Sequence, residues 1–231
     1  MTGILYGVGV GPGDPELMTL KAVRRIRENR VIAVPGERAE ETVAYRIAVQ
    51  AVPELAEKEL VALTMPMTHD REAMRRSHEQ AAEKLEAYLR EGENVVFLTL
   101  GDPTVYSTFS YVQRIVKDHG FTTELVSGIP SFCAAAARLD VPLVEWNEPL
   151  HVLPAVHRLE EGILEAPGNY VLMKSGRKMD RVKKLLAADR REVSMVENCG
   201  MENEHVYRCL EEIPDDAGYY SLIIAKEVEK R

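Results

Sequence analysis

The sequence of 231 residues has few cysteines, few aromatic residues and a single tryptophan. Its three cysteines, Cys133, Cys199 and Cys209, are odd in number and lack Cys-x-x-Cys spacing, which argues against a disulfide framework and a zinc site. The six histidines are scattered and show no His-Glu-x-x-His pattern. We therefore expect no protein-bound metal.

Basic residues are also in deficit. The formal net charge is −8 and no basic stripe is visible, which argues against a nucleic-acid partner. No apolar run approaches the ~20 residues of a membrane helix, and Met1-Thr-Gly-Ile4 leads directly into a strand-like segment without a charged leader. We expect a cytoplasmic protein that binds neither nucleic acid nor membranes.

Apolar segments of strand length alternate with helical patterns in the first half of the chain. Strands are expected near residues 4–8, 31–34, 59–64, 95–100 and 122–126, with helices between them. The second half is richer in strands, expected near residues 151–153, 170–174, 193–197, 206–210 and 219–225, with helices near 158–164 and 177–189. The sequence predicts an α/β protein of two α/β domains, 1–125 with a doubly wound, mostly parallel sheet and 126–231 with a mixed sheet.

Glycines occupy alternate positions directly after the first strand: Gly7, Gly9, Gly11 and Gly13. Glycine adopts backbone angles closed to other residues and lets another group approach the main chain. The pattern predicts a ligand-facing loop at the carboxyl end of a strand. A tight turn without a ligand is the alternative.

The residues after these glycines predict a helix start. Asp14 suits an N-cap, and Pro15 suits the first helical position. The glycines do not follow G-x-G-x-x-G, and Pro12 and Pro15 remove N–H groups that a pyrophosphate would need. The segment is therefore a poor match to a dinucleotide-binding fingerprint.

Three motifs together carry a resemblance to a known family. They are the glycine-rich segment Gly7–Thr19, Gly101-Asp-Pro-Thr-Val-Tyr-Ser-Thr-Phe109 and Ser127-Gly-Ile-Pro-Ser131. In order and spacing the chain resembles, over its full length, the tetrapyrrole methyltransferases of cobalamin and sirohaem biosynthesis. The segments Met65–Asp70 and Phe97–Tyr111 are most similar to the precorrin-2 (cobalt-factor II) C-20 methyltransferases.

This resemblance implies methyl transfer from S-adenosylmethionine to C-20 of a reduced tetrapyrrole, by a homodimer, in a cleft between the two domains. Carried over by position, the implied cofactor contacts are Val10, Asp102, Val105, Ser131, Phe132, Met173, Cys199 and Ile223. The substrate contacts that we expect are Gly11, Gly13, Asp14 and Arg177.

Methyl transfer from a sulfonium to carbon needs alignment and exclusion of water more than acid–base chemistry. Two residues are nevertheless candidates for catalysis. Tyr106 is expected to orient the substrate or relay the proton that leaves after methylation; the alternative is a packed aromatic at a helix start. Asp102 is expected to hydrogen-bond the cofactor, with ordinary helix capping as its alternative.

The expected substrate carries eight carboxylates, which a chain of net negative charge repels unless basic residues are gathered locally. The densest basic cluster beside a strand end is Lys174-Ser-Gly-Arg-Lys178, in which Arg177 is the best bidentate candidate. Lys21, Arg24 and Arg25 on the first helix are further candidates. A solvated helix start is the alternative for the cluster.

Other functions remain open from the sequence. They are methylation of another ring position, a non-catalytic sensor of an adenosyl ligand, and a nicotinamide dehydrogenase, for which Glu37 is the only acidic residue near the end of the second strand. We favour a cobalt-bearing substrate over metal-free precorrin-2, although no single residue decides between them.

Overall fold

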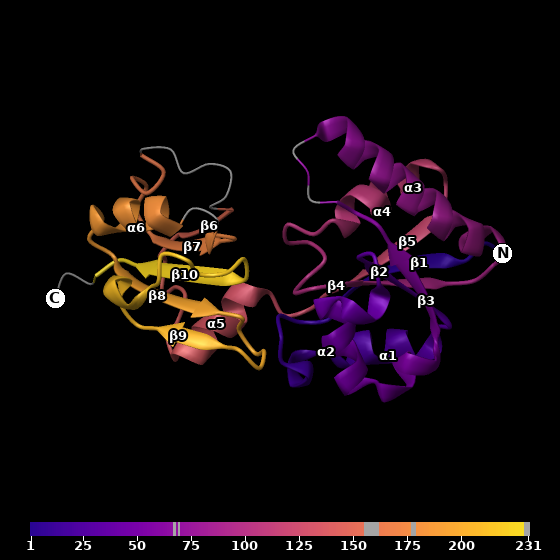
Figure 1. The fold of residues 1–231 in the computed structure, drawn as a ribbon, viewed down its shortest axis with the longest axis horizontal. Helices are drawn as coiled ribbons and strands as arrows, with labels where there is room; N and C mark the ends of the chain where they lie inside the picture. Colours follow the sequence, from indigo (N-terminus) through magenta and orange to yellow (C-terminus); the bar gives the residue numbers. More distant parts are fainter. Residues whose placement is uncertain (67, 69, 155–161, 177–178, 229–231) are drawn as a thin grey trace. The chain divides into compact units, whose positions relative to one another are not determined.

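The computed structural model describes residues 1–231 except 67, 69, 155–161, 177–178 and 229–231. The chain divides into two compact units, Met1–Pro130 and Ser131–Arg231. This division falls five residues after the predicted boundary, so the Ser-Gly-Ile-Pro segment belongs to the first unit. Figure 1 shows the layers of each unit.

A five-stranded parallel sheet forms the middle layer of the first unit. Its strands are β1 (Ile4–Gly9), β2 (Val31–Pro35), β3 (Glu59–Leu63), β4 (Val95–Thr99) and β5 (Thr122–Val126), in the order β3-β2-β4-β1-β5. Strands β1, β2 and β4 are apolar and buried on both faces, as expected where helices cover both sides of a parallel sheet. The predicted doubly wound sheet is confirmed.

Helices cover both faces of this sheet. Helices α1 (Leu20–Glu28) and α2 (Val43–Ala51) pack on one face, and α3 (Arg71–Arg90) and α4 (Phe109–Asp118) on the other. Neighbouring residues of β1 divide between these cores, Tyr6 with α1 and α2 and Leu5 with α3 and α4, because side chains alternate along a strand. Short 3-10 helices η1 (Pro15–Leu17), η2 (Ala39–Glu41) and η3 (Pro53–Glu57) complete the connections.

The order of the strands determines where a ligand fits. Strands β4 and β1 are neighbours, yet the chain leaves β1 for α1 on one face and β4 for α4 on the opposite face. Where neighbouring connections diverge in this way, a crevice opens outside the carboxyl ends of the strands. This edge carries the glycine-rich loop.

The second unit contains a mixed five-stranded sheet, as predicted. Its elements are α5 (Ser131–Leu139), β6 (Leu150–Pro154), β7 (Asn169–Met173), α6 (Met179–Ala187), β8 (Glu192–Glu197), β9 (His205–Tyr207), η5 (Leu210–Glu212) and β10 (Ser221–Lys226). The order is β6-β7-β10-β8-β9, with only the β6–β7 pair parallel. Helices α5 and α6 pack on opposite faces of this sheet. The helix expected near residues 158–164 lies largely outside the described residues, and residues 162–164 form a turn.

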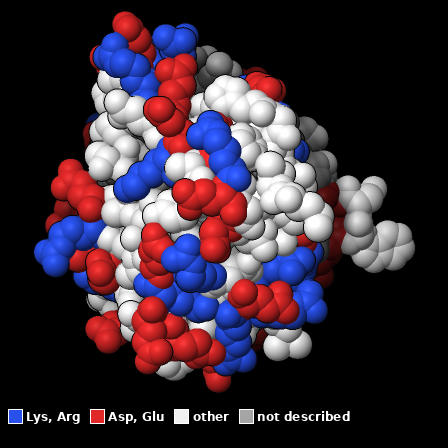
Figure 2. Space-filling view, turned by 90° about the vertical axis from the view of Figure 1, so that its right-hand side faces the viewer, with Lys and Arg blue, Asp and Glu red and all other residues white. Residues whose placement is uncertain are grey.

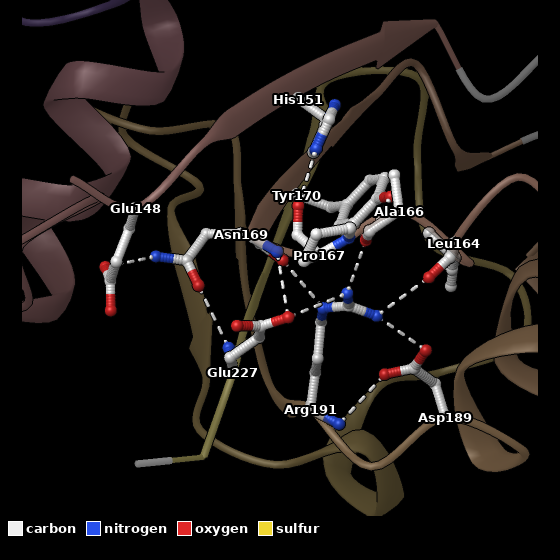
Figure 3. A network of polar contacts seen from close by, with 11 residues as sticks. Glu148, His151, Leu164, Ala166, Pro167, Asn169, Tyr170, Asp189, Arg191 and Glu227 are labelled. Carbon is white, nitrogen blue, oxygen red and sulfur yellow. Dashed lines mark hydrogen bonds and ion pairs between the residues drawn. The ribbon is translucent and has the colours of Figure 1, made fainter.

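A polar network around Arg191 holds the 164–168 segment of the second unit (Figure 3). Its guanidinium donates to the carbonyls of Gly168, Leu164 and Ala166 at 2.9–3.1 Å and pairs with Asp189 at 2.7 Å. The guanidinium also lies over the Tyr170 ring, 4.6 Å from its centroid. The Arg191 side chain is 9% exposed, so these contacts replace most of its water.

Candidate active site

Main-chain contacts join the loops that follow β1 and β4. The Val10 amide donates to the Thr99 carbonyl at 3.0 Å, and Gly11 and Gly101 exchange hydrogen bonds at 3.3 and 2.8 Å. Gly11 and Gly101 have φ of 77° and 70°, the left-handed region that glycine tolerates. Val10 is fully buried, so a contact between Val10 and the cofactor stays a prediction.

The loop after β5 joins this contact through Gly128. A Cβ atom on Gly128 would lie 2.2 Å from the Gly101 carbonyl oxygen, and one on Gly9 would lie 2.4 Å from the same atom. Both distances are shorter than any real contact, and the obstacle is backbone. Glycine is therefore required where the three loops cross. The sequence analysis identified the Ser-Gly-Ile-Pro segment but not this role of Gly128, for which the glycine itself is the only signal.

Asp102 ties two of these loops together from a buried position. Its Oδ2 accepts from the Gly128 amide at 3.0 Å, and its Oδ1 accepts from the amide of Thr104 at 2.7 Å and from the Thr104 hydroxyl. Helix α4 begins only at Phe109, so the helix-capping alternative for Asp102 is wrong. A contact between Asp102 and the cofactor stays a prediction.

Val105 and Tyr106 lie in the loop before α4, not in the helix expected there. Tyr106 has φ of 47°, which is uncommon for a bulky residue and typical of positions under functional constraint, and its side chain is 48% exposed. The next residue, Ser107, is buried and hydrogen-bonds Thr99 between hydroxyls at 2.8 Å. This bond pins the end of the loop to β4. The Thr99–Ser107 pair was not predicted from the sequence.

The glycine-rich loop ends in a cap, as expected. Asp14 accepts from the Glu16 amide at 2.8 Å and starts η1 with Pro15 in the first position. Gly11 and Gly13 are buried in the same loop. Helix α1 begins only at Leu20, where Thr19 caps it and donates to the Ser127 carbonyl at 3.3 Å. The arrangement lacks the helix start directly after β1 that dinucleotide pyrophosphates use, and the strand order differs from the dinucleotide fold.

In the second unit, three predicted cofactor contacts gather against one core. Phe132, Met173 and Cys199 all pack at the border of the cluster beneath α5. Ser131 is partly buried at the start of the same helix. Ile223 differs, because its side chain is fully buried in the core on the α6 face and its strand is paired on both sides.

The basic candidates for substrate carboxylates have different outcomes. Arg177 lies outside the described residues. On α1, Lys21 pairs with Glu124 at 2.7 Å and Arg25 with the same carboxylate at 3.4 Å. Lys21 and then Arg25 hold the pKa of Glu124 below its usual value. Arg25 also pairs with Glu28 at 3.2 Å, so both cations already have carboxylate partners within the first unit.

The charge distribution on the face shown in Figure 2 agrees with this pairing, since basic and acidic side chains are intermixed there. Within the described part of the chain, no three His, Cys, Asp or Glu side chains are placed to hold a metal ion. The same residues contain no helix long and apolar enough to cross a membrane.

Comparisons with known proteins identify the fold and the family. Residues 4–214 match the model of the "Tetrapyrrole (Corrin/Porphyrin) Methylases". The chain is 36% identical over 230 residues to the "Probable cobalt-precorrin-2 C(20)-methyltransferase" of Methanocaldococcus jannaschii, covering 98% of this chain and 97% of the relative. It is 30% identical to the "Precorrin-2 C(20)-methyltransferase" of Sinorhizobium sp, covering 96% and 94%.

Solved structures agree. The X-ray structure of the cobalamin biosynthetic enzyme cobalt precorrin-4 methyltransferase matches with a TM-score of 0.75 at 20% identity, covering 96% of this chain and 94% of that one, which shows the shared fold. Uroporphyrin-III C-methyl transferase from Thermus thermophilus, complexed with S-adenyl homocysteine, matches with a TM-score of 0.67 at 26% identity, covering 97% and 98%. The chain belongs to the tetrapyrrole (corrin/porphyrin) methylases.

Proposed function

We propose that this protein transfers a methyl group from S-adenosylmethionine to C-20 of precorrin-2 or its cobalt complex, a step of cobalamin biosynthesis. The observation that carries the proposal is the 36% identity, over nearly the whole of both chains, to a relative named for that reaction. A relative from Salmonella typhimurium, named "Cobalt-precorrin-2 C(20)-methyltransferase", is 31% identical over 98% of this chain.

The first unit fits the proposed methyl donor. Gly9, Gly101 and Gly128 bring the main chains of three loops into close contact at the carboxyl ends of the strands, which suits a ligand recognised by shape and peptide groups. The neighbour from Thermus thermophilus, in complex with S-adenyl homocysteine, supports this assignment. When bound, S-adenosylmethionine supplies an electrophilic methyl group. We propose that the residues that contact it are Val10, Asp102, Val105, Ser131, Phe132, Met173, Cys199 and Ile223.

The protein's contribution to the reaction is positional. The hydrogen bonds of Asp102 and the Thr99–Ser107 pair fix the loops, so that few groups have to reorganise during transfer. Tyr106 is held in a strained conformation beside them, and we propose that it orients the tetrapyrrole or relays the proton leaving C-20. Gly11, Gly13, Asp14 and Arg177 are the proposed substrate contacts.

The test is anaerobic incubation with S-adenosylmethionine and, separately, metal-free precorrin-2 and its cobalt complex. Mass spectrometry and NMR with a labelled methyl group then locate the new carbon. One methyl on C-20 from one of the two substrates identifies both the reaction and the preferred substrate, which we expect to be the cobalt complex. Methylation at another carbon would contradict the assigned position, and binding of the donor without turnover would indicate a sensor.

We also propose that the enzyme is a cytoplasmic homodimer without a resident metal ion. Sedimentation equilibrium should give twice the mass of the chain, and the monomer mass would contradict the dimer.

Transfer from a sulfonium to an electron-rich carbon needs no Lewis acid. Dialysis against a chelator should therefore leave the rate with metal-free precorrin-2 unchanged.

A further inference from the structure

Three segments of the second unit meet where strands β7 and β8 end and strand β10 begins. Strand β7 ends at Met173, β8 ends at Glu197, and the central strand β10 begins at Ser221. The register pairs Glu197 with Ser221 and Met173 with Leu222. The turn that enters β10 therefore lies beside the loops that leave β7 and β8.

The backbone where these segments meet is constrained. Lys174 and Asn198, the residues directly after β7 and β8, have φ of 60° and 52°. Such conformations cost energy in residues other than glycine and concentrate at ligand clamps. A Cβ atom on Gly176 would lie 2.1 Å from the Gly218 carbonyl oxygen, so the loop after β7 touches the turn before β10 main chain to main chain.

The carboxylate of Glu197 holds that turn. Its Oε1 accepts a short hydrogen bond from the Gly218 amide, and its Oε2 accepts from the Tyr207 hydroxyl at 3.4 Å. Burial, and after it the Glu197 charge, raises the pKa of Tyr207. The Ser221 hydroxyl donates to the Gly218 carbonyl at 2.6 Å and closes the turn from the other side. Glu197 thus joins β8, β9 and the turn before β10.

We propose that Glu197 is a positioning residue for binding of the methyl donor. It acts through Gly218: by holding the turn against Gly176, it keeps the main chain beside Met173 and Cys199 in the conformation that binds. This inference rests on the proposed function, because Met173 and Cys199 are assigned to the donor there. Neither the family resemblance nor the sequence motifs assigned a role to Glu197.

The experiment compares E197A with E197Q and with E192A, a matched glutamate exposed at the opposite end of β8. Calorimetry measures the affinity for S-adenosylhomocysteine, and steady-state kinetics measures KM for both substrates. E197A should weaken binding roughly tenfold or more, the size of one or two lost charged hydrogen bonds. E197Q should keep part of the affinity because its amide oxygen still accepts from Gly218. E192A should match the wild type.

A second variant keeps the test informative if E197A folds poorly. A Cβ atom on Gly218 would lie 2.7 Å from Glu197 Oε1, so G218A displaces the carboxylate without removing it. It should weaken binding in the wild-type background and add little to E197A, because both act on one contact. Additive losses would overturn the proposal.

The outcomes separate the two claims. If the wild type does not bind S-adenosylhomocysteine, the proposed function fails. If the wild type binds and E197A binds equally well, only the positioning role fails. A purely structural role would lower the melting temperature and leave KM for S-adenosylmethionine unchanged, whereas positioning raises that KM and leaves KM for the tetrapyrrole as it was.

Discussion

At the scale of single residues, the buried carboxylate of Asp102 holds two loops together, and we propose that it also contacts the cofactor. Three donors from Thr104 and Gly128 already bond its two oxygens, which leaves the carboxylate able to accept about one more hydrogen bond, from a cofactor. The side chain is only 7% exposed, which makes the loss of an acceptor costly. Its role in holding the loops is therefore separable from a role in binding.

We predict that D102N lowers the free energy of unfolding by about 1–3 kcal/mol, because asparagine has one acceptor oxygen and presents an amide to a buried donor. Urea denaturation measures the change. D118N, at an exposed position on α4, is the control and should change stability little. Equal stability of the two variants would contradict the role of Asp102 in holding the two loops together.

Tyr106 is a candidate for catalysis, so its variant should affect rate more than binding. If the hydroxyl relays the proton from C-20, Y106F should lower kcat by about 10²-fold and leave the affinity for S-adenosylhomocysteine unchanged. Y111F, a half-exposed tyrosine on the first turn of α4, is the matched control. A wild-type kcat in Y106F would exclude the relay.

At the scale of elements, two helices of the first unit start with a threonine cap of the same kind. Thr19 caps α1 and also donates to Ser127 after β5, whereas Thr42 caps α2 and donates within its own turn to Ala39. T19V and T42V should each cost about 1 kcal/mol of unfolding free energy. Only T19V should also weaken S-adenosylhomocysteine binding, since it alone releases a loop of the site. Equal binding by both variants would contradict this link.

The seam between α3 and α4 contains a histidine that titrates with folding. His78 is buried and stacked on Tyr111 with ring centroids 4.9 Å apart, and burial holds its pKa below the usual value of 6.5. The unfolded chain therefore takes up this proton at higher pH than the folded one. The contribution of His78 is fully present above about pH 6.5 and is lost as the pH falls toward the lowered pKa.

We predict that H78Q flattens the fall in stability as the pH drops below about 6.5, where the wild-type histidine gains its proton on unfolding. Urea denaturation at a series of pH values measures the slope. Exposed Gln80 on the same helix provides a control that does not titrate, since Q80A should keep the wild-type slope. An unchanged slope in H78Q would contradict the assignment.

At the scale of the whole molecule, each unit has its own pair of hydrophobic cores. We expect a substitution that destabilises one unit to leave the stability of the other unit unchanged. R191M removes the cation that three carbonyls and two carboxylates share, and should cost the second unit about 3–5 kcal/mol. Hydrogen exchange should speed up in β7 and β10 and remain unchanged in β1 and β4. Faster exchange in both sheets would show that the units unfold together.

The fold was predictable because alternating apolar strands and amphipathic helices are local patterns. Short sequence segments predict the strands of both sheets, the mixed character of the second sheet and the cap at Asp14. The crossing of Gly9, Gly101 and Gly128 was not predictable, because it depends on the register of three strands far apart in the chain. The sequence also did not predict which face of the second sheet Phe132 and Ile223 pack on, because the resemblance gives the position of a residue and not the direction of its side chain.

The crossing of three glycines also limits how this enzyme can evolve. At Gly9 and Gly128 a point mutation adds a Cβ atom that collides with a neighbouring peptide, and at Gly101 it adds one to a residue in the left-handed region. Selection for a different ring carbon must therefore act on the rim, at residues such as Tyr106, or on loop length. A directed-evolution experiment that seeks methylation of a different ring carbon should therefore keep the three glycines and vary Tyr106 and the residues around it.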